Sequence, residues 1–379
     1  MTAIANAPAP SALRGISGGV ASLLDNFASI KPADQVVIAY AADSRKYAAH
    51  LILELQSRDI GVRAVAMRPL VDPDIKAELH AVLPPRESLS GKLVVITLEK
   101  DSMSHFEVFA ELFELYGKNK CKILRIISAA DELFASAFTR TPRELSLRNA
   151  TLLEKLRSET KIRVTTEAGT DVEIELDHDR YDWISNRGTW RPGAFMILPA
   201  GEIATYPAKV NGILIADGAL NCNIVTRMDM RLGSQPLRIT IEDSVAVDFA
   251  CTNSEINYLV EGCFSRENGR FVGELGFGTN DGIADFVSDN SHMNERYPGL
   301  HLGFGQHNQA PSNVRYYADI HLDVVTRGGS VHLPDSGEVL RLDGFNPRHG
   351  IAHPVLIRDQ DITGDCCSSG CSVVRPVFG

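Results

Sequence analysis

The stretch DIHLDVV, residues 319–325, predicts a β-strand that holds two ionisable side chains among aliphatic ones. His321 and Asp323 stand two positions apart within it. Side chains alternate across a strand, so these two point to the same face and can converge on one object. A histidine and a carboxylate on one face of a buried strand indicate a metal ion as that object.

Three earlier stretches also place an acid or a histidine in an apolar or glycine-rich setting. They are ILPAGEIATYP (197–207), FVGELGFGTN (271–280) and NERYPGLHLGFGQHN (294–308). The complete set of candidate metal ligands is Glu202, Glu274, His301, His321 and Asp323. Each one alone has a structural explanation, such as a solvated turn carboxylate or a hydrogen-bonded core histidine. Burying one such charge without a partner costs several kcal/mol, so their recurrence favours a shared cation.

The first part of the chain alternates apolar runs with amphipathic stretches. Buried strands are predicted at QVVIAYA (35–41), VRAVAM (62–67), LVVITL (93–98) and CKILRII (121–127). Helices are predicted at 44–58, 104–118 and 141–159, the last with Thr141 as N-cap and Glu144 three positions on. This alternation predicts an α/β domain over residues 1–160 with a mostly parallel sheet. The domain contains no glycine-rich nucleotide-binding motif.

From about residue 160 the pattern changes to short strands and turns, as in NGILIADGAL and PLRITIEDSVAVDFA. Helical periodicity nearly vanishes. The pattern predicts a β-rich, barrel-like domain over residues 161–350, which would hold the metal ions. Residues 351–379 form a predicted tail with Cys366, Cys367 and Cys371. A flexible Ser/Gly-rich segment is the favoured interpretation of this tail, because a zinc site would need a fourth ligand.

The charge balance and hydropathy exclude several classes of partner. The chain has 38 Lys and Arg against 48 Asp and Glu, a net charge of −10, and no basic cluster, so nucleic acid is not an expected partner. No apolar run approaches the ~18 residues of a membrane-spanning helix, and the N-terminus lacks the order of a signal peptide. We therefore expect a cytoplasmic protein without a membrane partner. Seven cysteines without regular spacing fit a reducing compartment.

The order PAGE, GELGFGTN, HLGFG and HLD resembles the thermophilic-type metallo-aminopeptidases, the leucyl aminopeptidase-like thermophilic metalloproteases. The resemblance extends from about residue 30 to residue 345. It implies a hydrolase in which two divalent ions, zinc, cobalt or manganese, activate water to cleave an N-terminal peptide or amide bond. It also implies a small peptide or amino-acid amide as the substrate and a homodimer as the assembly.

The resemblance assigns metal-ligand roles to five positions, namely Glu202, Glu274, His301, His321 and Asp323. Glu274 would bridge the two ions. Glu295, just before the histidine strand, resembles another acidic ligand of the family and, if it is not itself a ligand, is the candidate catalytic base that accepts a proton from the water. His307 and Tyr317 are candidates for contact with the substrate or for support behind the ligands. Gly201 stands where many members of the family have a second acid, which bears on peptidase activity.

Two alternatives from other functional classes stay open. Some relatives resembling this family are ring-cleaving, non-haem Fe(II) dioxygenases acting on dihydroxypyridines. His301, His321 and Asp323 would then hold a single iron and leave positions open for O₂ and substrate. The other alternative is a non-catalytic peptide-binding protein on a decayed aminopeptidase scaffold. Because the dioxygenase has no need of a bridging acid, the presence of Glu274 favours the two-metal hydrolase.

Overall fold

The N-terminal part of the computed structural model, which describes residues 10–356, is built around a parallel sheet. The strand order is β2-β1-β3-β4-β8, and every neighbouring pair is parallel. The bounds are β1 (Gln35–Ala41), β2 (Val62–Met67), β3 (Leu93–Leu98), β4 (Cys121–Ile126) and β8 (Phe195–Leu198). The cysteines at 366, 367 and 371 lie outside the described residues.

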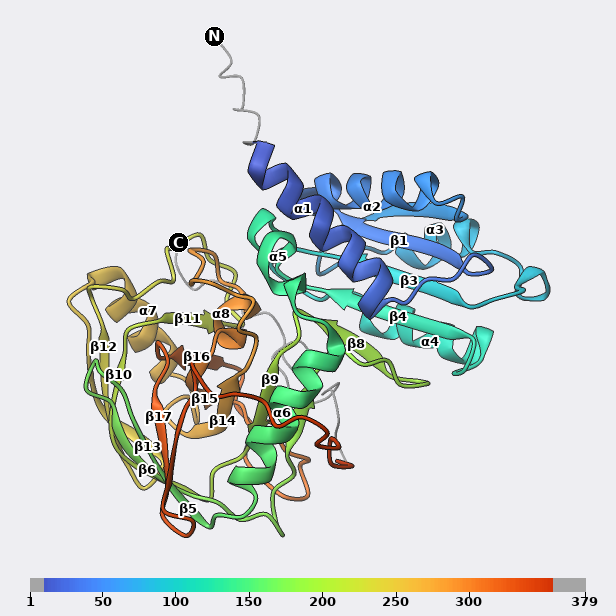
Figure 1. Ribbon diagram of the computed structural model, residues 1–379. Helices are drawn as coiled ribbons and strands as arrows, with labels where there is room; N and C mark the ends of the chain where they lie inside the picture. The colour runs from blue at the N-terminus through green and yellow to red at the C-terminus, as the bar shows by residue number, and fades with distance from the viewer. Residues whose placement is uncertain (1–9, 357–379) are drawn as a thin grey trace.

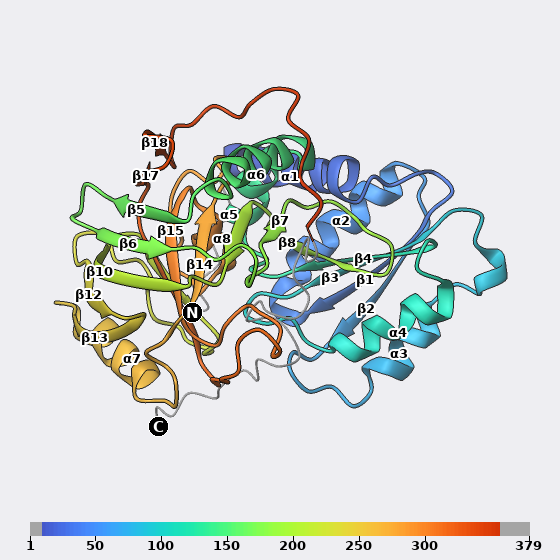
Figure 2. The same cartoon turned by 90° about the horizontal axis from the view of Figure 1, so that it is seen from below.

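Helices cover both faces of this sheet, as Figures 1 and 2 show. One face packs against α1 (Pro10–Ser22), α2 (Arg45–Ser57) and α5 (Asp131–Ser136). The other face packs against α3 (Ile75–Val82) and α4 (Phe106–Tyr116). Since both faces lie under helices, the inner strands β3 and β4 are buried at every position, and the α/β fold predicted from the alternation is confirmed.

The predicted elements of this part agree closely with the structure. The strands at 35–41, 62–67 and 93–98 have the predicted bounds. Helix α6 (Pro142–Leu156) begins with a capping box, in which the Thr141 side chain accepts from the Glu144 backbone and the Glu144 side chain accepts from the Thr141 backbone. Strand β8 comes after the predicted boundary at residue 160, yet it is an end strand of the parallel sheet.

The C-terminal part consists of two antiparallel sheets. The first has the order β13-β12-β10-β6-β5-β17-β18, and the second has the order β11-β16-β15-β14-β9-β7. The strands of the first are β5 (Lys161–Thr165), β6 (Asp171–Glu175), β10 (Lys209–Ala216), β12 (Leu237–Glu242), β13 (Val245–Ala250), β17 (Ser330–Leu333) and β18 (Glu338–Arg341). The strands of the second are β7 (Ile184–Asn186), β9 (Glu202–Thr205), β11 (Ala219–Cys222), β14 (Val272–Gly278), β15 (Gly299–Gly305) and β16 (His321–Val325).

The two antiparallel sheets pack face to face over one apolar core. Side chains of both sheets, together with α6 and α7 (Ser254–Phe264), belong to a single buried cluster. Within residues 10–356 neither sheet closes on itself, so the prediction of a β-rich domain is confirmed but its barrel-like form is not. Helix α7 and the short helix α8 (His292–Arg296) were not predicted.

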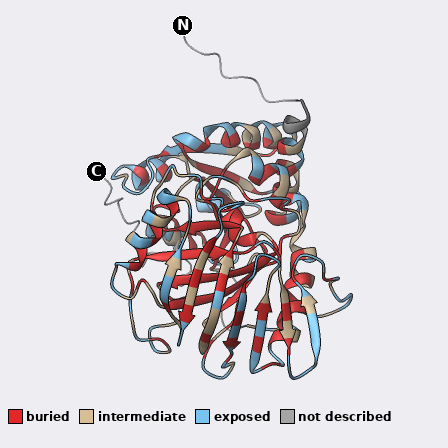
Figure 3. Ribbon diagram, turned by 90° about the vertical axis from the view of Figure 1, so that its left-hand side faces the viewer, coloured by how far each residue is buried: buried red, intermediate tan, exposed pale blue. Residues whose placement is uncertain are grey.

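The second antiparallel sheet is buried on both faces, but the two faces differ in chemistry. Figure 3 shows the extent of burial in this part of the molecule. The face toward the apolar core carries Leu275, Leu302 and Val324. Alternate positions on the same strands place acids, histidines and glycines on the opposite face. No helix among the described residues is long and apolar enough to cross a membrane.

Candidate metal centre

Cross-strand register aligns residues of four neighbouring strands. On the polar face, one row runs through Asn221 of β11, Asp323 of β16, Gly303 of β15 and Glu274 of β14. Adjacent strands lie ~4.8 Å apart, so the Asp323 and Glu274 carboxylates are two strands apart with a glycine between them. The glycine leaves the space between the two carboxylates free of a side chain.

The next rows add a histidine and a third acid. His301 of β15 lies opposite Gly276 of β14, and Glu202 of β9 lies opposite Gly278 of β14. Residues 276 and 278 follow Glu274 on the same face of the strand, so the spacing E-x-G-x-G clears space beside the acid. The acids and histidines of the motifs PAGE, GELGFGTN, HLGFG and HLD therefore lie on one face of the second antiparallel sheet.

Glycine is required at positions 276 and 303 on this face, because candidate ligand side chains lie directly against the backbone there. A Cβ atom at Gly276 would lie 1.9 Å from Nε2 of His301. A Cβ atom at Gly303 would lie 2.9 Å from Cβ of Glu274, 2.9 Å from Cε1 of His321 and 3.0 Å from Oδ1 of Asp323. Any side chain at either position would displace a candidate ligand, because real Cβ atoms do not approach other atoms within 3.0 Å.

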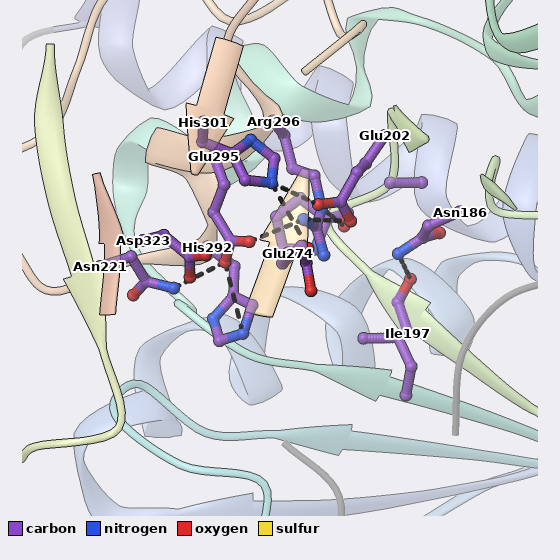
Figure 4. Close-up of polar contacts among 12 residues, drawn as sticks. Asn186, Ile197, Glu202, Asn221, Glu274, His292, Glu295, Arg296, His301 and Asp323 are labelled. Carbon is purple, nitrogen blue, oxygen red and sulfur yellow. Dashed lines mark hydrogen bonds and ion pairs between the residues drawn. The ribbon is translucent and has the colours of Figure 1, made fainter. Parts of the chain in front are cut away.

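Glu202, Glu274 and His301 form the first group of candidate ligands in the described chain, with one ligand atom of each within 4.8 Å of the others. His301 Nε2 lies 3.0 Å from Oε1 of Glu202 and 3.6 Å from Oε1 of Glu274. All three side chains are almost fully buried. Figure 4 shows the imidazole pointing toward both carboxylates.

Glu295, His301 and Asp323 form the second group, again within 4.8 Å of one another. Helix α8 presents Glu295 to the sheet. Oε1 of Glu295 accepts a 2.6 Å hydrogen bond from Nδ2 of Asn221 and lies 3.6 Å from Nε2 of His292, one turn earlier on the helix (Figure 4). His301 belongs to both groups, so it lies at the middle of the centre.

His321 lies outside both compact groups but is held against Asp323. Its Nδ1–H donates to the backbone carbonyl of Gln306 at 2.7 Å, since a carbonyl can only accept. Its Nε2 lies 2.9 Å from Oδ1 of Asp323. A neutral imidazole with its proton on Nδ1 would direct a lone pair at a carboxylate oxygen there. The pair therefore requires a proton or a cation in common.

Arg296 is a buried arginine inside the centre that the sequence analysis did not select. Its side chain is 1% exposed, and Nη1 lies 2.5 Å from Oε2 of Glu202 and 3.0 Å from Oε2 of Glu295. Nε donates to the backbone carbonyl of Pro199 at 3.3 Å. The guanidinium therefore joins one acid of each group, as Figure 4 shows.

Burial and mutual contact shift the pKa values of these groups. Burial raises the pKa of Glu274 to about 7. Burial also raises the pKa of Glu295 well above its ordinary value, although Arg296 acts in the opposite direction. Burial alone would lower the pKa of His301, but the adjacent Glu202 and Glu274 outweigh it and raise the pKa to about 10. Without a metal, the centre therefore holds protons near neutral pH.

The chemistry of this donor set fits a divalent metal ion. Within the described chain, Oε1 of Glu202 and both ring nitrogens of His301 are buried without a well-formed hydrogen bond. Carboxylate oxygens and imidazole nitrogens are ligands of Fe(II), zinc and manganese, and a metal would satisfy these atoms in place of protons. The structure therefore supports metal binding.

Two predicted residues, His307 and Tyr317, belong to neither ligand group of the described chain, and some participants were missed. His307 is buried, but its Nε2–H donates to the Tyr316 carbonyl at 2.9 Å and its Nδ1 accepts from the Gln309 backbone at 3.2 Å, so it stabilises a turn. Tyr317 is 56% exposed. Three residues of the centre were not predicted, namely Asn221, His292 and Arg296. The helical i, i+3 spacing of His292 and Glu295 was the available signal.

Gly201 cannot be replaced by the acid that many aminopeptidases have at this position. Its φ of +114° lies in a region that L-residues rarely adopt. A Cβ atom there would lie 2.5 Å from Cβ of Asn280. The Asn280 amide is itself fixed, because its Nδ2 donates to the carbonyls of Ala137 and Ala200. The backbone before Glu202 therefore excludes a Glu-Glu pair.

Comparisons with known proteins identify relatives. A sequence profile of the 2,5-dihydroxypyridine 5,6-dioxygenase family, NicX, matches residues 25–341. The structure of the 2,5-dihydroxypyridine dioxygenase from Pseudomonas putida KT2440 is similar with a TM-score of 0.57 at 16% identity, over 90% of this chain and 99% of that chain. Wild-type AmpT from Thermus thermophilus gives a TM-score of 0.49 at 12% identity, over 87% and 97% of the two chains. Comparison with curated protein sequences gives no significant match.

These findings overturn the prediction of a thermophilic-type metallo-aminopeptidase. The family match extends over most of the chain and is to dioxygenases, so the hydrolase, metalloprotease and peptidase assignments are wrong. The presence of Glu274, which favoured the hydrolase, does not separate the two families. The chain belongs to the NicX family of 2,5-dihydroxypyridine 5,6-dioxygenases.

Proposed function

We propose that this protein is an Fe(II)-dependent ring-cleaving dioxygenase for a dihydroxylated pyridine. His301, His321 and Asp323 are the proposed iron ligands, the alternative weighed from the sequence. Two imidazoles and one carboxylate are the ligand set typical of non-haem Fe(II) oxygenases. Membership in the NicX family supports the substrate class.

The observation that carries this proposal is the contact between His321 and Asp323. Nε2 of His321 and Oδ1 of Asp323 lie 2.9 Å apart, while Nδ1 is occupied by the Gln306 carbonyl. The hydrogen bond from Nδ1 to the Gln306 carbonyl fixes both the tautomer and the orientation of the ring, as is usual for metal-bound histidines. Asp323 in turn lies in the group that contains His301. The three side chains therefore present ligand atoms to one region.

Bound iron would supply the positions at which O₂ and the substrate meet and the electrons that activate O₂. The other tasks fall to the chain. Glu274, with a pKa of about 7 and Oε1 3.6 Å from Nε2 of His301, is placed to accept a proton from a ring hydroxyl. The burial of Glu274 and its neighbours excludes water from that proton transfer.

Oxygen uptake by iron-loaded protein tests the proposal. Protein reconstituted with Fe(II) without air should consume O₂ when 2,5-dihydroxypyridine is added, and the ultraviolet absorption of the pyridine should disappear in proportion. His321→Ala should remove both signals. His332→Gln is the matched control, because His332 bonds the Thr165 hydroxyl on the first antiparallel sheet. A lack of oxygen uptake with any dihydroxylated pyridine by iron-containing protein would contradict the proposal.

The homodimer expected from the sequence stays a prediction. The parallel sheet and the first antiparallel sheet each have an end strand with exposed residues, β2 and β18, at which a second copy could pair. Sedimentation analysis of the purified protein would test it, and a monomer at micromolar concentration would contradict it.

A further inference from the structure

The arginine in the metal centre has a position that needs explanation. Arg296 is 1% exposed, so its charge is removed from water at a large cost unless it is paired. The structure pairs it twice, with Glu202 at 2.5 Å and with Glu295 at 3.0 Å. The hydrogen bond to Pro199 fixes the inner end of the guanidinium at the start of the segment that leads to Glu202.

A count of charges shows what the arginine does for the centre. The two ligand groups of the described chain contain four carboxylates, on Glu202, Glu274, Glu295 and Asp323. Arg296 supplies one fixed positive charge, because a guanidinium does not lose its proton in proteins. One divalent ion would supply two more, which nearly balances the four acids. Two divalent ions together with Arg296 would exceed them.

The arginine also links the two ligand groups. It contacts Glu202 from the first group and Glu295 from the second, and the two groups share His301. The guanidinium therefore holds one acid from each of the two groups that share His301.

We propose that the Arg296 guanidinium takes the place of a second metal ion in this centre. It holds Glu202 and Glu295 as a second ion would, so the centre binds a single ion at His301, His321 and Asp323 beside Glu274. This inference rests on the proposed function for the identity of that ion. The role of Arg296 as an internal cation does not depend on which divalent metal is bound.

A metal count on the wild-type protein and on Arg296→Met tests the inference. Both proteins are stripped with a chelator, titrated with Mn(II) or Zn(II) without air, desalted and analysed for metal. The wild type should retain about one ion per chain, and Arg296→Met, which keeps the length of the side chain without its charge, should retain about two. Arg148→Met is the matched control. Arg148 is also buried and bonds Thr279 and Asp281 instead of the acids of the centre, so this variant should retain about one ion.

Each outcome decides the question. Two ions in the wild type, or one in folded Arg296→Met, would overturn the inference. If Arg296→Met unfolds without metal, excess Mn(II) or Zn(II) should restore its far-ultraviolet circular dichroism, because the second ion replaces the lost charge; failure to restore it would also overturn the inference. Arg296→Lys, which keeps the charge, should retain about one ion.

Failure of the proposed function is distinguishable from failure of this inference. Oxygen uptake is measured on the wild-type sample after loading with Fe(II). One ion per chain without oxygen uptake would reject the dioxygenase and keep the role of Arg296. Oxygen uptake with two ions per chain would reject the role of Arg296 and keep the dioxygenase.

Discussion

Two buried clusters of charged side chains differ in how they are balanced. In the parallel sheet, Glu99 accepts from the Ser102 and Ser104 hydroxyls and from the Ser104 backbone, and lies 3.5 Å from Arg125. Nε of Arg125 donates to the Thr97 hydroxyl. In the metal centre, four carboxylates of the described chain face one arginine and the histidines.

The difference between the two clusters shows how a buried ion pair that only stabilises the fold can be told from a cluster that binds a ligand. The Glu99 cluster has one acid and one base, and both oxygens of its carboxylate accept hydrogen bonds. The metal centre has an excess of acid and, in the described chain, leaves Oε1 of Glu202 and the His301 ring nitrogens without a well-formed hydrogen bond. Burial is similar in both clusters, so burial alone does not identify a site. The imbalance between donors and acceptors does.

The largest effect is expected from Asp323→Asn, which removes a charged ligand from the unbalanced cluster without a loss of volume. Iron retention and oxygen uptake should fall by more than the ~10–100-fold that is typical of residues that only orient ligands. Metal analysis and an oxygen electrode measure the two quantities. Unchanged iron content would remove Asp323 from the centre.

Arg125→Met should affect stability rather than metal content. The change leaves the Glu99 carboxylate buried without its cation, which costs ~3–5 kcal/mol in the free energy of unfolding. Urea denaturation measures this loss, and iron retention by the folded variant should equal that of the wild type. Loss of iron at full stability would show that the two clusters are not separate in function.

Gly276→Ala should weaken metal binding without removing a ligand. The added Cβ would lie 1.9 Å from Nε2 of His301, so the ring must move away from its partners. Metal affinity should fall by about 10-fold or more, comparable to the loss of an orienting residue. Gly344→Ala is the control, because a Cβ there meets no atom within 4 Å. Equal affinity in both variants would mean that the glycines do not set the position of His301.

The smallest effect is the pH dependence of stability. Glu274 and His301 bind protons more tightly in the folded state, with pKa values of about 7 and about 10 against 4.5 and 6.5. Their contribution to metal-free stability is therefore complete at low pH and is lost as pH rises through these ranges. Metal binding releases these protons, so the increase in melting temperature caused by Mn(II) should grow from pH 6 to pH 8. An increase that shrinks with pH would contradict the assignment.

Much of the centre could be predicted because strand alternation is visible in sequence. Glu202, Glu274, His301 and Asp323 were predicted together, and the register places them on one face. Arg296 was missed because an arginine beside an acid is ordinarily solvated, and only the three-dimensional course of α8 buries it.

The family was assigned wrongly for a related reason. The ordered motifs describe a scaffold for buried acids and histidines, and that scaffold supports more than one chemistry. Two features exclude a second acid at Gly201, its positive φ and the closeness of Asn280, which is far along the chain. The order of strands was also beyond prediction, because β8 joins a sheet whose other members end at residue 126.

The course of β8 has a consequence for how the molecule is assembled. This strand completes the edge of the parallel sheet beside β4, and a link of three residues later the chain enters β9 at Glu202. A fragment that ends at residue 160 would lack β8, so β4 would have no partner on that edge. In the remaining fragment β8 would lack β4, the strand whose pairing fixes the start of the segment that leads to Glu202. The two halves are therefore not interchangeable modules that evolution or an engineer can graft separately; they must be inherited, and must fold, as one piece.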